Sequence, residues 1–220
     1  MIDPLSLAIS AGSFAVSATT AWLTLFRSGK LKMTRPTLFY LGPDGITDNN
    51  GERGNAKVFL RAFLYSTSKR GKIIENMFVA VSRGEASQPF NIWIYREEGR
   101  LSRGSGLHVD QEGRALDHHF LIPPNSSDFK FVSGDYTLKV YAKIVRIERP
   151  KLLQVVSAHL PDSIAREAAD SGAGAFFDWA PDLGLYYVHS RPPPTNDENQ
   201  SPDVSLAAGL RAKANPPPTF

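Results

Sequence analysis

The feature that most constrains the fold is a series of short apolar segments, separated by turn residues, between residues 37 and 160. Several of these segments alternate apolar and polar residues, which is the period of a β-strand with one buried face. No segment with helical periodicity intervenes, so consecutive strands need no helical crossover and can pair antiparallel. We therefore predict a mainly β domain over residues 37–190, an immunoglobulin-like antiparallel sandwich, with a small β-barrel as the alternative.

The alternation also predicts which side chains face the core. The predicted strands are 37–41, 57–65, 73–82, 90–95, 101–110, 115–122, 128–132, 136–142 and 151–159. The shared faces are Phe90, Ile92 and Ile94 in one strand, and Tyr136, Leu138, Val140 and Ala142 in another. A tyrosine placed as early in its strand as Tyr136 can bond its hydroxyl to the backbone at a sandwich corner. Turns are expected at 42–45, 69–71 and 111–114, and a loop at 46–55.

The sequence after residue 160 predicts a different pattern. A short helix is expected over 163–170, with Asp162 or Ser163 as its cap and Gly172 ending it. A hairpin follows, with strands 176–179 and 185–189 around a turn at 181–184. From residue 191 the chain is rich in proline and poor in apolar residues, so we predict a disordered tail over 191–220.

The N-terminal segment contains no charged residue from position 4 to position 26. A helix of this length measures roughly 34 Å, enough to cross a hydrocarbon core of about 30 Å. A cleaved signal peptide, a buried core helix and a surface helix are the alternatives, but the segment lacks a positive n-region and a charged face. We therefore predict that residues 1–26 form a transmembrane anchor. Its insertion-favouring residues are Pro4, Leu5, Leu7, Ile9, Phe14, Val16, Trp22, Leu23, Leu25 and Phe26.

Basic residues follow this segment directly, in a predicted linker over 27–36. They are Arg27, Lys30, Lys32 and Arg35, whereas only Asp3 and the amino terminus precede the segment. Positive flanking residues stay on the cytoplasmic side. The prediction is an inner-membrane, single-pass protein with its N-terminus outside and its β domain in the cytoplasm. Lys69 and Arg70 are candidate contacts for a partner or for lipid headgroups.

Several strings resemble those of uncharacterised bacterial inner-membrane proteins with one N-terminal transmembrane helix and a β-sandwich-like domain. They are residues 20–26, 33–36, 59–71, 91–95, 103–106, 118–121 and 177–182. The resemblance covers roughly residues 4–190 and excludes the tail. It implies a bacterial protein held in the inner membrane by one span, and it implies no chemistry, cofactor or catalytic residue.

Composition excludes several kinds of site. The chain has no cysteine, so disulfides, thiolate metal sites and a cysteine nucleophile are absent. Its net charge is only +3, and no alternation of aromatic and basic residues suggests a nucleic-acid surface. The Gly-rich string at 103–106 lacks the lysine and the strand-to-helix context of a phosphate-binding loop. We predict no cofactor and no catalytic residues.

One group of residues is a metal-site hypothesis. His108 and Asp110 are two residues apart, as are Asp117 and His119, so each pair can share one face of a strand. If the turn near Gly113 made a hairpin, the four side chains would meet and could bind a divalent metal. An ordinary cross-strand His–Asp pair is the simpler interpretation.

Three functions are compatible with these features. The first is a non-catalytic, membrane-tethered interaction module, which binds the bilayer through residues 4–26 and an unidentified protein partner through its β domain. The second is a metal-dependent enzyme that uses the His/Asp group. The third is a structural subunit of a membrane complex that self-associates through small residues of the anchor helix.

Overall fold

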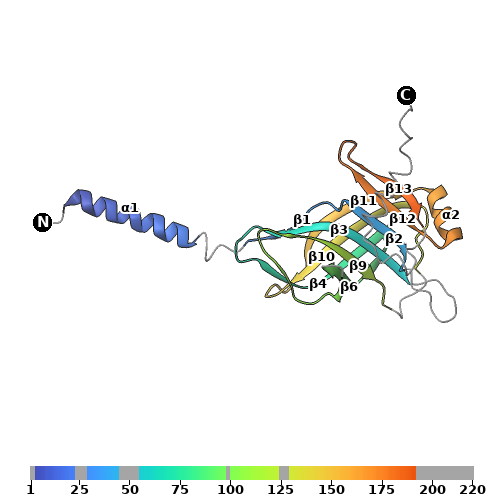
Figure 1. The fold of residues 1–220 in the computed structure, drawn as a ribbon, viewed down its shortest axis with the longest axis horizontal. Helices are drawn as coiled ribbons and strands as arrows, with labels where there is room; N and C mark the ends of the chain where they lie inside the picture. The colour runs from blue at the N-terminus through green and yellow to red at the C-terminus, as the bar shows by residue number, and fades with distance from the viewer. Residues whose placement is uncertain (1–2, 23–28, 45–54, 98–99, 124–128, 192–220) are drawn as a thin grey trace, which may run out of the picture.

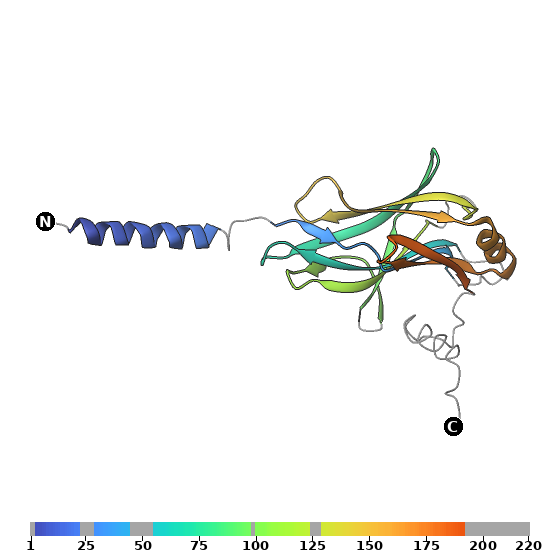
Figure 2. The same cartoon turned by 90° about the horizontal axis from the view of Figure 1, so that it is seen from above.

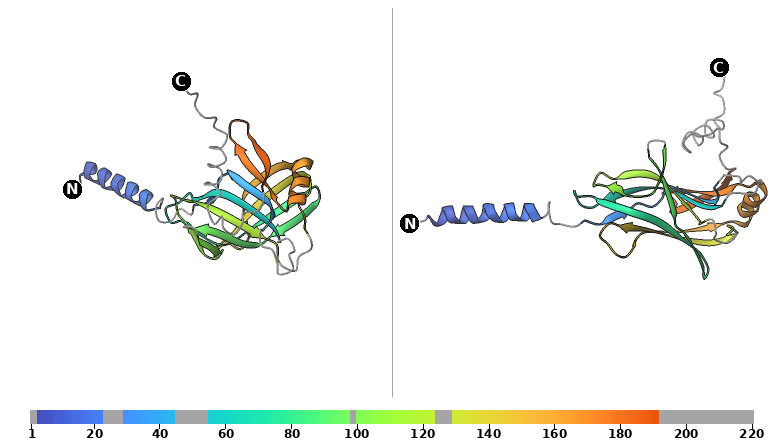
Figure 3. Two further views of the ribbon diagram at one scale, coloured as in Figure 1. Left: turned by 45° about the vertical axis from the view of Figure 1, so that its right-hand side comes forward. Right: turned by 90° about the horizontal axis from the view of Figure 1, so that it is seen from below.

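The computed structural model describes residues 3–22, 29–44, 55–97, 100–123 and 129–191 (Figure 1). Within these ranges the body consists of antiparallel strands in two sheets, which lie one over the other when the molecule is viewed from above or below (Figures 2 and 3). The prediction of a mainly β, antiparallel, sandwich-like domain is confirmed. Neither sheet's strand path closes on itself in the described residues, so the arrangement differs from the alternative of a single closed barrel.

The larger sheet has eight strands in the order β13-β12-β2-β3-β9-β6-β7, with β1 paired to β3 beside this path. Its strands are β1 (Leu31–Met33), β2 (Leu38–Pro43), β3 (Ala56–Ser66), β6 (Ile92–Glu97), β7 (Arg100–Arg103), β9 (Arg114–Leu121), β12 (Gly174–Ala180) and β13 (Leu185–Arg191). The segment predicted as a linker over 27–36 therefore contains a strand. Leu31 and Met33 are buried in it, and Lys32 between them is exposed.

The smaller sheet has five strands in the order β11-β10-β4-β5, with β8 also paired to β4. Its strands are β4 (Lys72–Arg83), β5 (Ala86–Phe90), β8 (Leu107–Val109), β10 (Gly134–Ile144) and β11 (Lys151–Leu160). The predicted face of β10 is confirmed as its buried face, from Tyr136 to Ala142. This face packs against the inward side chains of β3 in the larger sheet, such as Leu60 and Leu64, to form one core.

Two predicted strands are each split between the sheets, which corrects the prediction. The run 90–95 consists of the end of β5 and the start of β6, which belong to different sheets and meet at the exposed Asn91. Because the chain changes sheet there, Phe90 is buried from one side of the core, and Trp93 and Tyr95 are buried from the other. Ile92 and Ile94, predicted to share the buried face of Phe90, are only partly buried. The run 101–110 is divided in the same way between β7 and β8.

Other boundaries also differ from the prediction. Gly42 and Pro43 belong to β2, where they pair with Lys57 and Ala56, so these two residues are strand and not turn as predicted; residue 45 of the predicted turn lies outside the described residues. Residues 129–132 form no strand; instead the rings of Phe129 and Phe131 pack on Phe90. Residues 46–54 of the predicted loop and residues 192–220 of the predicted tail lie outside the described residues.

The C-terminal elements follow the prediction closely. Helix α2 (Asp162–Ser171) ends at Gly172, which adopts a left-handed conformation with a φ of 71°. Its N-terminal cap is Pro161, which makes no side-chain hydrogen bond. The prediction that Asp162 or Ser163 caps the helix was therefore wrong. Strands β12 and β13 form the expected hairpin, whose turn is closed by a hydrogen bond from Gly184 N to Ala180 O at 2.9 Å.

The corner predicted at Tyr136 is present. Its hydroxyl donates to Val132 O at 2.6 Å and accepts from Val132 N at 3.0 Å. The ring is fully buried at the start of β10, so one side chain fixes the approach of the preceding loop to the core. A tyrosine bonded to backbone a few residues upstream is a recurring feature of immunoglobulin-like sandwiches.

Helix α1 (Pro4–Ala21) precedes the body, with Asp3 as its cap and a proline in its first turn. None of its side chains is buried against the body, from which it extends in Figure 1. Within the described residues, no helix has the length and apolar character needed to cross a bilayer. This finding differs from the span predicted over 4–26, because frequent serine and threonine lower the apolar character of α1. Residues 23–26 lie outside the described residues.

Candidate functional site

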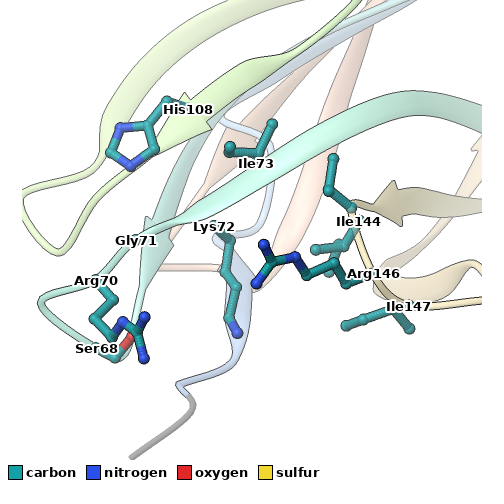
Figure 4. Close-up of a pocket in the computed structure, with 10 residues that line it drawn as sticks. Ser68, Arg70, Gly71, Lys72, Ile73, His108, Ile144, Arg146 and Ile147 are labelled. Atoms are coloured by element: carbon teal, nitrogen blue, oxygen red, sulfur yellow. The ribbon is translucent and has the colours of Figure 1, made fainter. Parts of the chain in front are cut away.

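The structure brings basic residues from three segments together in an open groove of about 530 Å³ at one end of the body. The lining residues are Ser68, Arg70 and Gly71 from the β3–β4 turn, Lys72 and Ile73 from β4, His108 from β8, and Ile144, Val145, Arg146 and Ile147 from the end of β10 and the turn after it. Figure 4 shows Lys72 and Arg146 beside β4 and Arg70 on the neighbouring turn. No carboxylate is among these described lining residues.

The β3–β4 turn gives the groove one of its walls. Gly71 has a φ of 66°, which favours glycine, and a Cβ built there would lie 2.5 Å from His108 Nε2. The turn is closed by a hydrogen bond from Gly71 N to Ser68 O at 3.1 Å. Glycine thus permits both the tight turn and the close approach of the His108 ring. The predicted break at 69–71 is confirmed, and its conformation places Arg70 and Lys72 on the groove.

The β10–β11 turn gives the opposite wall. Val145 N donates to Ile73 O at 3.0 Å, which joins this turn to β4. Arg146 has a φ of 69°, the one positive φ of a non-glycine residue among the described residues. This conformation disfavours a side chain with a Cβ, so it needs support from the surrounding structure. The turn therefore holds Arg146 at the groove with a local backbone cost.

The chain that leads from α1 into the body is bound directly to the groove-lining turn. Lys30 N donates to Thr67 Oγ1 at 2.8 Å, and Thr67 N donates to Lys30 O at 3.0 Å. A Cβ at Gly29 would lie only 2.5 Å from Ser68, so the two backbones are closely packed. The groove thus lies at the end of the body where the chain arrives from α1.

The basic residues predicted to set topology take different positions. Lys30 is exposed beside the groove-lining turn, and Lys32 is exposed on β1, opposite Tyr65 of β3. Arg35 lies 4.0 Å above the Trp179 ring, in a cation–π contact with the β12–β13 hairpin. Arg27 lies outside the described residues. Of the two predicted contact residues, Arg70 lines the groove, and Lys69 is exposed on the same turn.

The four candidate metal ligands do not meet. β8 pairs with β4 in the smaller sheet and β9 pairs with β3 and β6 in the larger, so the turn at Gly113 makes no hairpin. His108 lies at the groove, and Asp110 instead accepts a hydrogen bond from Gly113 N at 2.8 Å. Asp117 binds Arg61. The described residues contain no group of three or more His, Asp or Glu that could hold a metal ion.

The two adjacent histidines are neutral near pH 7; His118 is fully buried, and His119 is partly buried. Because residues of a strand alternate, His118 faces the core and His119 the opposite side of β9. Trp93 Nε1 donates to His118 Nδ1 at 3.2 Å. Burial lowers the pKa of His118 to about 4 and, together with the nearby Lys57 and Arg96, that of His119 to about 3. In the described structure neither Nε2 atom has a hydrogen-bond partner.

The partner of Asp117 on the larger sheet is Arg61. Arg61 Nε lies 2.7 Å from one carboxylate oxygen and Nη2 lies 3.1 Å from the other, a bidentate pair between β3 and β9. The two residues are directly opposite each other in the strand register. This contact is structural, and it explains why Asp117 is not available as a metal ligand.

The Gly-rich string at 103–106 is explained by packing. A Cβ at Gly104 would lie 1.9 Å from the Trp93 ring, and Gly104 N donates to Trp93 O at 2.8 Å. Glycine is therefore required where the chain leaves β7 beside the buried tryptophan.

Sequence reasoning missed most of the groove. Lys72, His108 and Arg146 are separated along the chain and meet only through the pairing of β4 with β8 and β10. The available signal was the clustering of cations at turns that follow apolar strands. That signal does not reveal which turns lie at the same end of a sandwich.

Comparison with protein-family models, curated proteins and solved structures finds no match for this chain. The resemblance to uncharacterised inner-membrane proteins therefore stays a prediction. Three structural features bear on the function: the geometry of the body, the exposed helix and the basic groove.

Proposed function

We propose that the protein is a non-catalytic, membrane-tethered interaction module, in which α1 enters the bilayer and the sandwich binds a protein partner. The observation that carries this proposal is α1 itself. It is an uncharged helix of 18 residues whose side chains are all left uncovered by the body. A helix with apolar side chains all around its axis needs an apolar environment, since no one face suffices to bury them.

The hydroxyl groups of α1 are hydrogen-bonded within the helix, which lowers the free-energy cost of placing them in an apolar environment. Ser10 Oγ donates to Ser6 O at 2.8 Å, Ser13 Oγ to Ile9 O at 2.9 Å, and Thr20 Oγ1 to Val16 O at 2.8 Å. A hydroxyl that is bonded to its own helix leaves little hydrogen-bonding capacity to be lost in lipid. The uncharged sequence also continues to Phe26, beyond the end of α1.

The charges around the helix support one orientation. Lys30 and Lys32, both exposed, follow α1, and Asp3 precedes it. Basic residues are retained on the cytoplasmic side of inner membranes. We infer that the N-terminus is outside and the body is cytoplasmic. An immunoglobulin-like identity of the sandwich belongs to the same proposal, and the Tyr136 corner supports it.

Strand β11 is the surface we propose for the partner. With ten residues, it is the longest described strand that pairs with another strand on one side only. Val155 N bonds to the side chain of Gln154 and not to β10, so this N–H lies on the open edge. Leu152 and Val155 are half exposed. A strand added to this edge would gain backbone hydrogen bonds and contacts to these side chains.

Membrane extraction tests the tether. The full chain is expressed in bacteria, and isolated membranes are washed with alkaline carbonate, which releases peripheral proteins. We expect the wild type to stay in the membrane. Ile9→Asp/Val16→Asp should be released, because an aspartate near the middle of a span costs about 2.5–3.5 kcal/mol. Ser10→Ala/Ser13→Ala, the uncharged control, should stay. Release of the wild type would refute the tether.

A proline substitution tests the edge. Val155→Pro removes the open N–H and spares the pairing with β10, which edge strands tolerate. Ser157→Cys supplies the single thiol of the chain on the same strand. We expect a bifunctional maleimide to cross-link this thiol to a partner in cells, and we expect Val155→Pro to abolish the adduct and Val155→Ala to keep it. An adduct that persists with Val155→Pro would exclude strand addition at β11.

A structural subunit that self-associates through α1 is the second candidate. Ala8, Gly12 and Ala15 lie on neighbouring turns of the exposed helix, and small residues allow helices to approach closely. Cross-linking through α1 that yields only copies of this chain would favour this function. No observation favours a metal-dependent enzyme, because the four candidate ligands lie apart.

A further inference from the structure

The groove defined above gathers basic side chains from three segments at one end of the body. Arg70, Lys72 and Arg146 line it together with His108, and no carboxylate lines it among the described residues. Like charges gathered on one concave surface repel one another and raise the local concentration of anions. The ligand expected from charge alone is therefore an anion.

The apolar part of the lining narrows the class of anion. Ile73 and Val145 are more than two-fifths exposed at the groove, and Ile144 and Ile147 lie beside the basic side chains. A small, fully hydrated anion gains nothing from this apolar surface. An amphiphile gains from both parts, since it presents a charged group and hydrocarbon together.

The location of the groove identifies a source of such an amphiphile. The groove-lining turn carries the backbone contacts between Thr67 and Lys30, the residue that leads from α1. If α1 is in the bilayer, this end of the body lies next to the membrane surface. Arginine matches phosphate oxygens with paired hydrogen bonds, and lysine adds a point charge.

We propose that this groove binds the phosphate group of an anionic phospholipid in the membrane that holds α1, and that Arg70, Lys72 and Arg146 are its phosphate contacts. The choice of a lipid rests on the proposed function. The positive φ of Arg146 fits this role. Glycine would adopt this backbone conformation without strain, so an arginine here is explained if its side chain contributes to binding. Bound lipid would fix the body close to the bilayer, with β11 held in a defined position for its partner.

Vesicle binding tests the groove independently of the tether. The protein is the full chain carrying Ile9→Asp/Val16→Asp, so that insertion of α1 does not dominate. Binding is measured by co-sedimentation with vesicles of phosphatidylcholine alone and of an equal mixture with phosphatidylglycerol. We expect binding to the mixed vesicles only, weakened by salt. Arg70→Gln/Arg146→Gln in this background should bind about 30-fold more weakly, because each basic residue near an anionic surface contributes a factor of about five to the affinity.

A matched variant separates the groove from net charge. Arg100→Gln/Arg103→Gln removes the same two charges from β7, an exposed strand of the other sheet, and should change the binding less than twofold. Thermal unfolding of each variant checks that the fold is intact. Arg146→Gly offers a second check, since it should weaken binding while glycine suits the backbone conformation of the turn.

The outcomes are distinct. Equal losses for the groove and β7 variants, or no preference for phosphatidylglycerol, would overturn the proposal. Displacement by millimolar inorganic phosphate at constant ionic strength would identify a free-phosphate site and overturn the lipid source. Failure of the tether is read separately, from carbonate release of the wild-type chain.

Discussion

At the scale of single residues, the most consequential contact is the ion pair between Arg61 and Asp117. Their side chains are 23% and 10% exposed, and both oxygens of the carboxylate are used. Removing one member leaves the other charge largely desolvated, which costs more than the pair itself contributes. The net attraction within the pair therefore contributes little to stability, but loss of either member is strongly destabilising.

We expect Asp117→Asn to lower the free energy of unfolding by about 3 kcal/mol, at the lower end for a buried pair because Arg61 keeps some contact with water. Urea denaturation measures the change. Arg61→Met/Asp117→Leu, which removes both charges, should recover most of the loss. Glu85→Gln, at an exposed turn, is the control and should be neutral. A loss below about 1 kcal/mol would show that the pair is solvated.

The two adjacent histidines predict an acid-sensitive stability. Their pKa values of about 4 and about 3 in the folded protein are below the ordinary value of 6.5 expected in the unfolded chain. Between pH 6.5 and pH 4 the unfolded state therefore binds protons that the folded state does not. Stability is full above pH 6.5 and falls as the pH is lowered through this range, by a few kcal/mol in total.

The slope of unfolding free energy against pH measures this effect above the range in which carboxylates titrate. His118→Phe removes one of the two groups, so the slope should become flatter even though the loss of the Trp93 hydrogen bond lowers the overall stability. A wild-type slope near zero between pH 6.5 and pH 5 would contradict the lowered pKa of both histidines.

At the scale of elements, the alternation of apolar and polar residues was sufficient to predict the long strands. It was insufficient to predict where the chain changes sheet. The buried face of β10 follows directly from its period of two. At Asn91 the apolar run continues while the chain crosses from one sheet to the other. Both sheets bury apolar residues toward the same core, so the sequence contains no signal of the crossing.

The same limit explains the metal hypothesis. The spacing of Asp117 and His119 correctly places both on one face of β9, and a turn does lie at Gly113. Whether that turn joins paired strands depends on contacts with β3, β4 and β6, which are distant in the sequence. The turn chemistry alone does not distinguish a hairpin from a connection between sheets. The basic groove could not be predicted from the sequence for the same reason.

The Tyr136 corner is an element that the sequence did predict, and it can be tested. Tyr136→Phe leaves the N–H and the carbonyl of Val132 without their partner at the start of β10. We expect a loss of about 1–2 kcal/mol in the free energy of unfolding. Tyr141→Phe, whose ring stacks on Phe78 in the middle of the same strand, is the matched control and should cost less than about 0.5 kcal/mol. Equal losses would mean that the corner bond is not stabilising.

At the scale of the whole molecule, three features follow one another from the N-terminal helix onward. An uncharged helix precedes the body, a basic groove lies where the chain arrives from that helix, and a long open strand runs from the 145–150 turn toward α2. A tether, a surface that faces the bilayer and an edge for a partner would together make an adaptor at a membrane. The central claim is that α1 crosses the membrane and leaves the body on the cytoplasmic side.

Two single-cysteine variants test this claim most directly, since the chain contains no other thiol. Ile2→Cys lies before α1, and Ser102→Cys lies on the exposed strand β7. Bacterial spheroplasts that express either variant are treated with a membrane-impermeant maleimide, before and after permeabilisation. The proposed topology predicts that Ile2→Cys is labelled in intact spheroplasts and that Ser102→Cys is labelled only after permeabilisation. Identical labelling of the two positions would contradict it, because the chain would then not cross the membrane between them.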